Sequence, residues 1–302
     1  MRRSLAVLAV VLAVAGSAAG GLALRAQSPA RAQDAAPAGG ESSGSFVPPA
    51  APGLITILVL GSDARPGEPI ARLRSDSIHL VTINPRTGAG TVLGFPRDSY
   101  VAIPGRGSAR INEAMVYGGP QLTEATIESL TGIHIDYYVL ASFQGFSDLV
   151  DGIGGIVVDV PYDMQDPYSG ANFRKGRTKL NGTRALAFAR DRHSVPGGDF
   201  GRSENQGRLL LAALRQLRQD FAVAPASVTK WVVVAARHVT TDLTIPELFR
   251  LGAAATRIRP SRVTNVVVPG SVGMVGSASV VFVAPSARAL FADIRDDGAV
   301  NG

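Results

Sequence analysis

Ionic side chains stand at the ends of two neighbouring strand-like segments, where they could hold a metal ion. Asp63 follows the apolar run 54–60, and Asp76 precedes the apolar run 77–83. If these runs form antiparallel neighbouring strands, both carboxylates reach the same edge of a sheet. Hard oxygen ligands of this kind suit Mg²⁺. The alternative is a pair of turn aspartates, each of which caps local backbone amides.

A third strand-like segment adds an arginine and another carboxylate. The apolar run 91–95 leads into Arg97 and Asp98. A guanidinium group is a planar donor that matches two phosphate oxygens at once. Asp98 is a candidate general base for a hydroxyl proton, and an equally good alternative is that it only orients Arg97.

A second basic group surrounds the start of a predicted helix. Arg190 and Arg192 close one helical segment. Arg202 and Gln206 are four residues apart at the start of the next segment, so they share a helix face. Arginines near a helix N-terminus are unfavourable with the helix dipole unless an anion lies between them and the free amides. The pattern indicates a bound phosphate, and the alternative is a solvated loop rich in arginine.

The composition is that of a folded protein with a local concentration of positive charge. The chain has 302 residues, 46% of them hydrophobic, no cysteine and a net charge of +6. These values exclude a disordered chain, a disulfide scaffold and a thiolate metal site. Nine basic and three acidic residues lie within 174–208, around the second basic group. A local anion site explains this distribution better than a diffuse compositional bias.

Several common nucleotide and metal motifs are missing from the sequence. No lysine follows a glycine, and no complete Gly-x-Gly-x-x-Gly occurs. No pair of histidines has the spacing of zinc ligands. These absences argue against a nucleotide site and a histidine zinc site. Ordinary surface or half-buried positions are expected for all four histidines: His79, His134, His193 and His238.

The N-terminus carries the pattern of a membrane segment. Two arginines precede the uncharged stretch 4–24, which Arg25 closes and which is long enough to cross a bilayer as a helix. We therefore expect residues 1–25 to be a membrane anchor or a secretory signal, and a small-x-small pattern at 30–32 leaves cleavage open. Either reading places the rest of the chain outside the cytoplasm.

The remainder divides into a linker and one domain. Residues 26–53 are rich in Ala, Pro, Gly and Ser and predict a flexible spacer. Residues 54–297 alternate between strand-like and helix-like segments, which predicts an α/β domain whose sheet is covered by helices. The expected helices are 121–130, 144–150, 182–189, 203–221, 226–239, 245–258 and 285–296, and the expected strands are 54–60, 77–83, 91–95, 137–140, 156–160, 263–268 and 279–283.

These segments, read together, resemble the LytR-CpsA-Psr family. Similar strings occur in the family's order and cover roughly residues 54–220. The strings are Leu60-Gly61-Ser62-Asp63-Ala64-Arg65, Arg74-Ser75-Asp76-Ser77, Ile83-Asn84-Pro85, Pro96-Arg97-Asp98, Ile111-Asn112-Glu113-Ala114, Gly118-Gly119, Ile135-Asp136-Tyr137-Tyr138, Val150-Asp151-Gly152-Ile153-Gly154-Gly155, Leu180-Asn181-Gly182, Ala189-Arg190-Asp191-Arg192-His193 and Gly198-Asp199-Phe200-Gly201-Arg202.

The resemblance implies a fold and an activity. The fold is a three-layer α-β-α domain with a central mixed sheet, preceded by an N-terminal transmembrane helix. The activity is a Mg²⁺-dependent phosphotransferase reaction, with Mn²⁺ as an alternative metal. It moves a glycopolymer from a polyprenyl-pyrophosphate carrier onto a muramic acid hydroxyl of peptidoglycan and forms a phosphodiester during cell wall assembly. The polymer is arabinogalactan, a teichoic-type acid or a capsular polysaccharide.

The implied location is the cell membrane of a Gram-positive or actinobacterial cell. The chain would cross the membrane once, with its C-terminal domain extracytoplasmic. The basic charge also suggests a nucleic-acid-binding regulator, but export argues against it because DNA is not available outside the membrane. We therefore expect no nucleic acid partner.

By the same likeness, individual residues match functional positions of the family. Asp63 and Asp76 match the metal-site carboxylates. The catalytic residues would be Arg97, Asp98 and Arg74. The residues that match the family's pyrophosphate site are Arg74, Arg97, Arg190, Arg192, Arg202 and Gln206.

One position departs from the family pattern. The family usually reads Arg-x-x-Arg-Gln, whereas this chain has Asn205 before Gln206. Arg208, one turn further along, is a candidate replacement for the missing arginine. If Asn205 cripples the site, the alternatives are a non-catalytic binding protein for polyprenyl phosphate or wall polymer, or a polyprenyl pyrophosphatase.

The lipid carrier also requires an apolar surface. We expect a tunnel between the sheet and its helices, lined by residues 127–135 and 209–217. The alternative for these apolar residues is plain core.

Overall fold

The side chains of strand β1 (Ile55–Ser62) are all buried, because helices cover both faces of its sheet. The computed structural model describes residues 53–65 and 67–300. The predicted membrane segment at 1–25 and all but the last residue of the predicted linker at 26–53 lie outside this part of the chain. Within the described residues, no helix is both long and apolar enough to span a membrane.

The central sheet has six strands in the order β11-β6-β1-β2-β3-β12. β1 pairs antiparallel with β2 and parallel with β6, and β3 pairs antiparallel with β2 and parallel with β12. The expected central mixed sheet is therefore confirmed. Its strands are β1, β2 (Ser75–Asn84), β3 (Ala89–Gly94), β6 (Tyr137–Ser142), β11 (Thr240–Thr241) and β12 (Val263–Val267).

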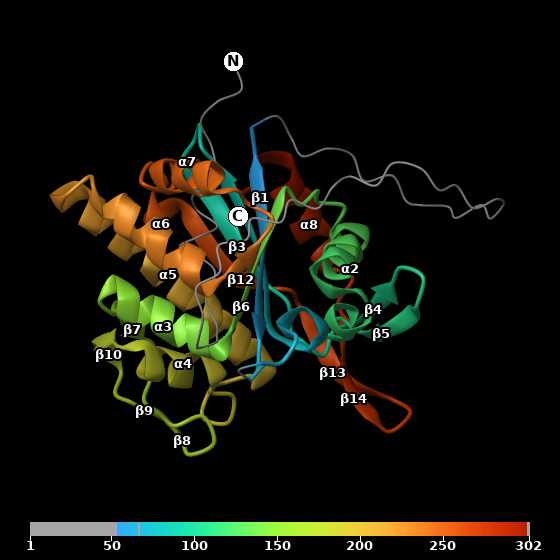
Figure 1. Cartoon of the computed structure of the whole chain (residues 1–302). Helices are drawn as coiled ribbons and strands as arrows, with labels where there is room; N and C mark the ends of the chain where they lie inside the picture. The colour runs from blue at the N-terminus through green and yellow to red at the C-terminus, as the bar shows by residue number, and fades with distance from the viewer. Residues whose placement is uncertain (1–52, 66, 301–302) are drawn as a thin grey trace.

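Alternate residues of the central strands enter two separate cores. Ile57 and Val59 pack into one core, and Leu58 and Leu60 pack into the other. Figure 1 shows one group of helices on each side of the sheet. The first side carries α3 (Phe143–Ile153), α4 (Gly182–Arg190), α5 (Asp199–Val223), α6 (Ser227–His238) and α7 (Ile245–Ala255), and the second carries α2 (Glu113–Thr131) and α8 (Ala287–Asp297).

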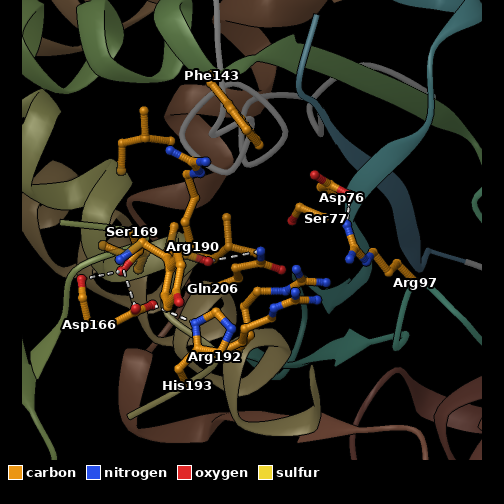
Figure 2. A pocket seen from close by; sticks show the side chains of 16 residues that line it. Asp76, Ser77, Arg97, Phe143, Asp166, Ser169, Arg190, Arg192, His193 and Gln206 are labelled. Atoms are coloured by element: carbon orange, nitrogen blue, oxygen red, sulfur yellow. Dashed lines mark hydrogen bonds and ion pairs between the residues drawn. The ribbon is translucent and has the colours of Figure 1, made fainter. Parts of the chain in front are cut away.

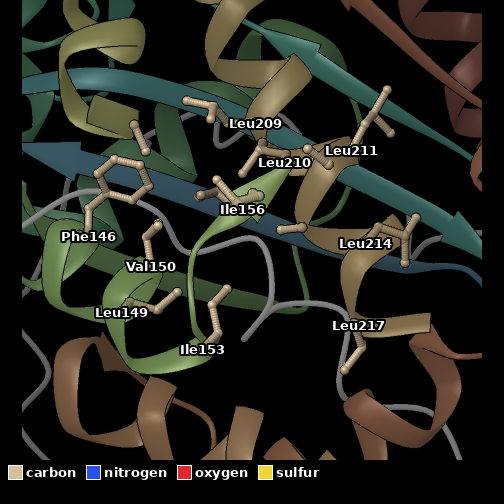
Figure 3. Close-up of a cluster of buried hydrophobic side chains, with 14 of the residues drawn as sticks. Phe146, Leu149, Val150, Ile153, Ile156, Leu209, Leu210, Leu211, Leu214 and Leu217 are labelled. Atoms are coloured by element: carbon tan, nitrogen blue, oxygen red, sulfur yellow. The ribbon is translucent and has the colours of Figure 1, made fainter. Parts of the chain in front are cut away.

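The long helix α5 anchors the first core. Leucines of α5 meet apolar residues of α3 and of strand β7 (Ile156–Val160), as Figure 3 shows. Leu210, Leu214 and Leu217 are each at most 3% exposed. Full burial of one such side chain stabilises the fold by about 1.5–3 kcal/mol. This packing fixes the rotation of α5 about its axis, and so decides which of its polar residues face solvent or a cavity.

The sequence analysis missed most strands of the small two-stranded sheets and predicted only those at 156–160 and 279–283. They are three to six residues long and half exposed, so their apolar periodicity is weak. The pairs are β4 (Tyr100–Ile103) with β5 (Gly107–Arg110), β7 with β10 (Gly176–Leu180), β8 (Met164–Asp166) with β9 (Ala171–Phe173), and β13 (Gly270–Val275) with β14 (Ala278–Val283).

Two helix starts also differ from expectation. α2 begins at Glu113 rather than at 121, because the helix continues through a kink at Gly119, which has φ +70° and precedes Pro120. α5 begins at Asp199 rather than at 203. Its first turn contains Gly201, where a Cβ atom would lie 2.2 Å from the carbonyl oxygen of Pro196. A glycine at this position lets the preceding loop pack directly on the helix.

The predicted lipid tunnel is not formed by the segments expected to line it. Ile127 lies in the core between the sheet and α2, whereas Leu209 and Leu217 lie in the core on the opposite face. The sheet separates the two segments, so they cannot line one tunnel. Most of these residues are plain core, which was the alternative.

One histidine lies buried within the sheet rather than at the surface. His79 of β2 is 0% exposed, contrary to the expectation for the four histidines. Its Nε2 lies 3.0 Å from the carbonyl oxygen of Ser203, and its Nδ1 lies 3.2 Å from the hydroxyl of Ser77. Burial lowers the pKa of His79 to about 4, although the Ser203 carbonyl favours the charged form.

This burial predicts a loss of stability at acid pH. Above pH 6.5 the imidazole is neutral in both states, so it has no effect on the free energy of unfolding. Between pH 6.5 and 4 the unfolded chain binds the proton and the folded chain does not, so stability falls by about 3 kcal/mol. Urea unfolding of the wild type and of His79→Gln across this range measures the difference. Equal pH slopes in the two proteins would contradict the prediction.

Candidate active site

The pairing of β1 and β2 brings two carboxylates to one edge of the sheet. The predicted antiparallel pairing is confirmed, and Ser75 and Ser77 face consecutive residues of β1, so Asp76 is the extra residue of a β-bulge. Bulges re-aim a side chain at the point where they occur. Partial burial and the nearby charge of Asp76 raise the pKa of Asp63, which directly follows β1. The two carboxylates are therefore close enough to repel each other.

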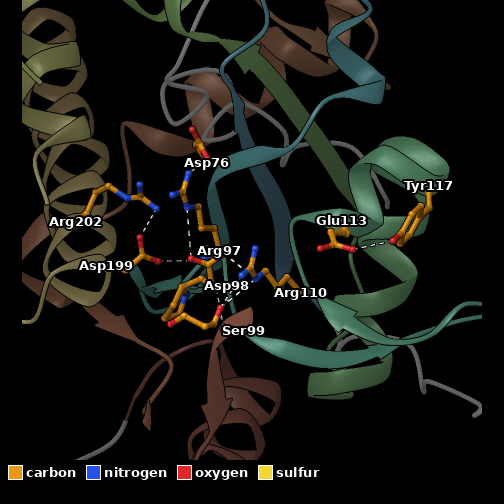
Figure 4. Close-up of polar contacts among 11 residues, drawn as sticks. Asp76, Arg97, Asp98, Ser99, Arg110, Glu113, Tyr117, Asp199 and Arg202 are labelled. Carbon is orange, nitrogen blue, oxygen red and sulfur yellow. Dashed lines mark hydrogen bonds and ion pairs between the residues drawn. The ribbon is translucent and has the colours of Figure 1, made fainter. Parts of the chain in front are cut away.

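Arg97 links this sheet edge to the start of α5. Its Nη1 donates to Asp76 Oδ1, and its backbone amide donates to Asp199 Oδ2 over 3.2 Å. Burial lowers the pKa of the Arg97 guanidinium, but the charge of Asp76 outweighs it and the pKa is raised. Arg202 completes the network through an ion pair with Asp199 (Figure 4). Four charged side chains from β2, the β3–β4 loop and α5 are thus held together.

Arg202 is the most buried charge of this network. It is only 6% exposed, and burial lowers its pKa despite the ion pair with Asp199, with Arg97 and Arg192 lowering it further. The Nε atoms of Arg97 and Arg202 are buried and have no hydrogen-bond partner within the described part of the chain. Buried donors without partners are costly, and an anion would satisfy them. The arrangement therefore favours a bound phosphate.

The helix-terminus argument needs one correction. The sequence suggested that arginines begin the helix without a compensating charge. Because α5 starts at Asp199, an acidic residue occupies the first turn and pairs with Arg202. The case for an anion therefore rests on the buried guanidinium groups and not on an uncompensated helix dipole.

A cavity of about 330 Å³ opens beside this network (Figure 2). One part of its lining is cationic, and another is apolar. The arginines come from the β3–β4 loop, α4, the loop after α4, and α5. Its lining includes Asp76, Arg97, Arg190, Arg192, Arg202, Gln206, the apolar side chains Phe143, Leu186, Leu209 and Leu210, and the group Asp166, Tyr168, Ser169 and His193.

Two of these residues are positioned at the C-terminus of α4. The guanidinium of Arg190 lies 5.1 Å from the ring centroid of Phe143. Gln206 of α5 donates from Nε2 to the carbonyl oxygen of Ala189 over 3.1 Å. Gln206 therefore ties the two helices together next to Arg190. Six of the nine predicted site residues line this one cavity.

Three predicted site residues lie outside the lining of this cavity. Asp63 is exposed at the sheet edge beside Asp76. Arg74 is exposed. A hydrogen bond to Glu113 raises the pKa of Tyr117 of α2, and the charge of Arg74 opposes this rise.

Asp98 turns toward another arginine. One of its oxygens lies 3.5 Å from Arg110 Nε, and the other lies 3.8 Å from Arg97 Nε. Figure 4 shows Asp98 between these two arginines. This placement suits the orienting role that the sequence analysis gave as the alternative for Asp98.

The departure at Asn205 also lies outside the cavity. Asn205 is 1% exposed. Burial raises the pKa of the nearby Tyr162 hydroxyl, and the side chain of Asn205 opposes this rise. Arg208 pairs with Glu204 and lines a different cavity with Arg215. The expectation that Arg208 replaces a phosphate-binding arginine is therefore wrong, because the rotation of α5 turns it away from Arg202.

The sequence analysis missed an ionisable pair in the lining of the cavity. The sequence predicts an ordinary surface or half-buried position for His193 and carries no signal for Asp166. In the structure His193 Nδ1 lies 3.1 Å from Asp166 Oδ2. The two residues are 27 positions apart, one at the end of β8 and the other in the loop after α4, so spacing carries no signal for the pair.

Asp63 and Asp76 are suitable ligands for Mg²⁺. Within the described residues, no group of three or more His, Cys, Asp and Glu side chains is arranged to hold a metal. Mg²⁺ usually binds through one or two carboxylates, with water and substrate phosphates completing its shell. The chemistry of these two oxygen donors fits such an ion, as does the raised pKa of Asp63, which is due to partial burial and to the charge of Asp76.

Comparisons with known proteins find similar sequences along most of the chain. The LytR_cpsA_psr family model matches residues 22–293. A polyisoprenyl-teichoic acid–peptidoglycan teichoic acid transferase TagU of Bacillus mycoides is 36% identical over 196 residues, which are 65% of this chain and 62% of the relative. The chain thus spans less than two thirds of the length of this relative.

Solved structures show the same fold. The crystal structure of B. subtilis TagV has a TM-score of 0.69 and 30% identity, and the match covers 80% of this chain and 95% of TagV. A LytR-Csp2A-Psr enzyme from Actinomyces oris has a TM-score of 0.64 and 27% identity, with 82% of this chain and 90% of that chain covered.

Proposed function

The chain belongs to the LytR-CpsA-Psr family, and on that premise we propose that it transfers a glycopolymer from a polyprenyl-pyrophosphate carrier to peptidoglycan. One observation carries the proposal above all. The buried guanidinium of Arg202 lies with Arg97 and Arg192 at a single cavity and keeps an unpaired Nε. A doubly charged pyrophosphate is the kind of anion that such a group binds.

The cavity also suits the rest of the carrier. Phe143, Leu186 and Leu209 lie in the same lining as the arginines. A ligand with a charged group next to an apolar chain matches this combination, and a polyprenyl pyrophosphate has that form. We infer that the first part of the lipid chain contacts these side chains.

The proposed reaction is an in-line displacement at phosphorus. A muramic acid hydroxyl attacks the phosphorus that carries the sugar, a phosphodiester forms, and polyprenyl phosphate leaves. Charge spreads over the phosphoryl oxygens in the transition state, so catalysis depends on positioning and electrostatic stabilisation. Arg97 and Arg202 are held in place by Asp76 and Asp199 for that purpose.

Mg²⁺, or Mn²⁺ in its place, belongs to the same proposal. Asp63 and Asp76 would hold it, and when bound it would neutralise charge on the phosphoryl oxygens. We also propose that residues 1–25 anchor the chain in the cell membrane by a single crossing, with residues 54–297 extracytoplasmic and no nucleic acid as partner.

A transfer assay tests the proposal. The full chain is incubated with a lipid-linked glycopolymer, peptidoglycan oligomers and Mg²⁺, and linked product is measured. Arg192→Ala is expected to lower product formation about 10- to 100-fold, because a charge-assisted hydrogen bond is worth about 1.5–3 kcal/mol. Arg192 is exposed, so its removal leaves the core intact.

The matched control is Arg177→Ala. Arg177 is an exposed arginine of β10 in the same basic stretch, outside the cavity lining. It should leave the rate unchanged. No linked product from the wild type, or equal effects of both variants, would contradict the proposal. Polymer phosphate released without linked product would instead indicate a pyrophosphatase, and lipid retained without turnover would indicate a binding protein.

A further inference from the structure

A buried carboxylate holds a partly exposed histidine at the cavity. Asp166 of β8 is 1% exposed, whereas the side chain of His193, in the loop after α4, is 45% exposed. Asp166 Oδ2 lies 3.1 Å from His193 Nδ1. Figure 2 shows this contact on the cavity wall away from Asp76 and Arg97. The pair thus joins a protected orienting group to an accessible ring.

The hydrogen bonds of Asp166 set the tautomer of this ring. Burial raises the pKa of Asp166, but hydrogen bonds from His193 and from the backbone amide of Tyr168, which lies 2.9 Å from Oδ1, lower it below its usual value. An ionised carboxylate accepts a hydrogen bond and does not donate one, so the proton of the neutral ring is on Nδ1. Nε2 then keeps its lone pair and can accept a proton.

The orientation of the ring is restrained from a second side. The ring of Tyr168 lies 4.8 Å from the imidazole, centroid to centroid, at an interplanar angle of 48°. The backbone amide of His193 donates to Asp191 Oδ1 over 3.1 Å, which fixes the loop beneath the ring. Groups that act on a reacting atom need this kind of restraint from their neighbours.

Other acidic groups near the phosphate-binding arginines are already engaged. Asp76 and Asp199 pair with Arg97 and Arg202, and Asp98 lies between Arg97 and Arg110. The charged groups that line the cavity with His193 are Asp76, Arg97, Asp166, Arg190, Arg192 and Arg202. His193 is the histidine of this lining and has a ring nitrogen left for a substrate.

On the basis of the proposed function, we propose that His193 is the general base for the acceptor hydroxyl and that Asp166 positions it. The hydroxyl oxygen forms the new bond to the sugar-linked phosphorus, and the bond from that phosphorus to the polyprenyl phosphate oxygen breaks. The leaving group takes that electron pair. The hydroxyl proton passes to His193 Nε2 and then to water. Asp166 stays ionised and stabilises the protonated ring.

The first test is the pH dependence of transfer by His193→Gln. The wild-type rate should fall at acid pH because the base becomes protonated. His193→Gln is expected to lower kcat about 100-fold or more and to lose this acid limb, because general base catalysis contributes about 10²- to 10⁴-fold. Binding of a C15 prenyl pyrophosphate, measured by calorimetry, should stay within about twofold, because the arginines bind the phosphates.

A matched control histidine is available on the other side of the molecule. His134 is 44% exposed, and its Nδ1 lies 2.8 Å from Glu128 Oε1. It therefore has an exposure and a carboxylate partner similar to those of His193, but it lies outside the cavity lining. His134→Gln should leave kcat and the pH profile unchanged. Retention of rate and acid limb by His193→Gln would overturn the inference while wild-type product still supports the proposed function. If the wild type gives no product, both the proposed function and this inference are wrong.

Asp166→Asn tests the positioning role. It removes the charge that stabilises the protonated ring, so the acid limb should move to lower pH and kcat should fall. A merely structural role would lower the amount of active protein without moving the limb. An unchanged limb in folded Asp166→Asn would therefore overturn the role of Asp166.

Discussion

Arg97→Ala is expected to reduce transfer about 1,000-fold or more, the largest effect of any single substitution in the site. The side chain lines the cavity, its Nη1 binds Asp76, and its Nε is buried without a hydrogen-bond partner among the described residues. A positioned arginine that stabilises transferring phosphoryl charge is worth about 10³- to 10⁵-fold in rate. Initial rates with the lipid-linked polymer measure the effect.

A conservative variant and a neighbouring arginine make this prediction specific. Arg97→Lys keeps the charge but loses the planar fork, so it should recover only part of the rate. Arg110→Ala removes an arginine that pairs with Asp98 outside the cavity lining, and its rate should stay near that of the wild type. A folded Arg97→Ala protein within tenfold of the wild-type rate would rule out the role assigned to Arg97.

Asp76→Asn is expected to lower transfer about 100-fold or more and to weaken its dependence on Mg²⁺. The bulge in β2 places this carboxylate next to both Asp63 and Arg97, so the substitution removes a proposed metal ligand and the partner of the arginine. A bound metal contributes several kcal/mol of charge stabilisation to a transition state. The rate is measured against Mg²⁺ concentration for the wild type and the variant.

Two controls distinguish the effect of the metal on the rate from the effect of the Arg97–Asp76 ion pair. One is chelation of the metal, and the other is substitution of an aspartate far from the site. EDTA should stop wild-type transfer, and added Mg²⁺ or Mn²⁺ should restore it. Asp163→Asn removes an exposed carboxylate that pairs with Arg174 away from the site, and it should respond to Mg²⁺ as the wild type does. Full wild-type activity in EDTA would contradict the metal proposal. The ion pair with Arg97 would then be the only role assigned to Asp76.

Much of the sheet and of the cationic site could be predicted from local patterns. Apolar runs bounded by turn residues placed β1, β2 and β3 within a few residues, and their antiparallel order brought Asp63 and Asp76 to one edge. The four-residue spacing of Arg202 and Gln206 placed both on the cavity side of α5. These inferences succeeded because strand alternation and helix periodicity depend on neighbours in the chain.

Other features were beyond local patterns. Arg208 is on the same helix as Arg202, yet its direction depends on how Leu210 and Leu214 pack against the sheet. The tunnel prediction failed for a similar reason, because two apolar segments look alike whether they cover the same face of the sheet or opposite faces. Burial of His79 likewise depends on α5 lying across β2.

The sequence by itself determined the family, the α/β class, the order of the main elements and the residue types of a cationic cavity. Tertiary structure alone decided which of those residues share a cavity, that Asp98 faces Arg110, and that Asp166 meets His193. The physical reason is that charge and periodicity are properties of short segments. Contacts between distant loops exist only after the two cores have packed and set each helix at one angle.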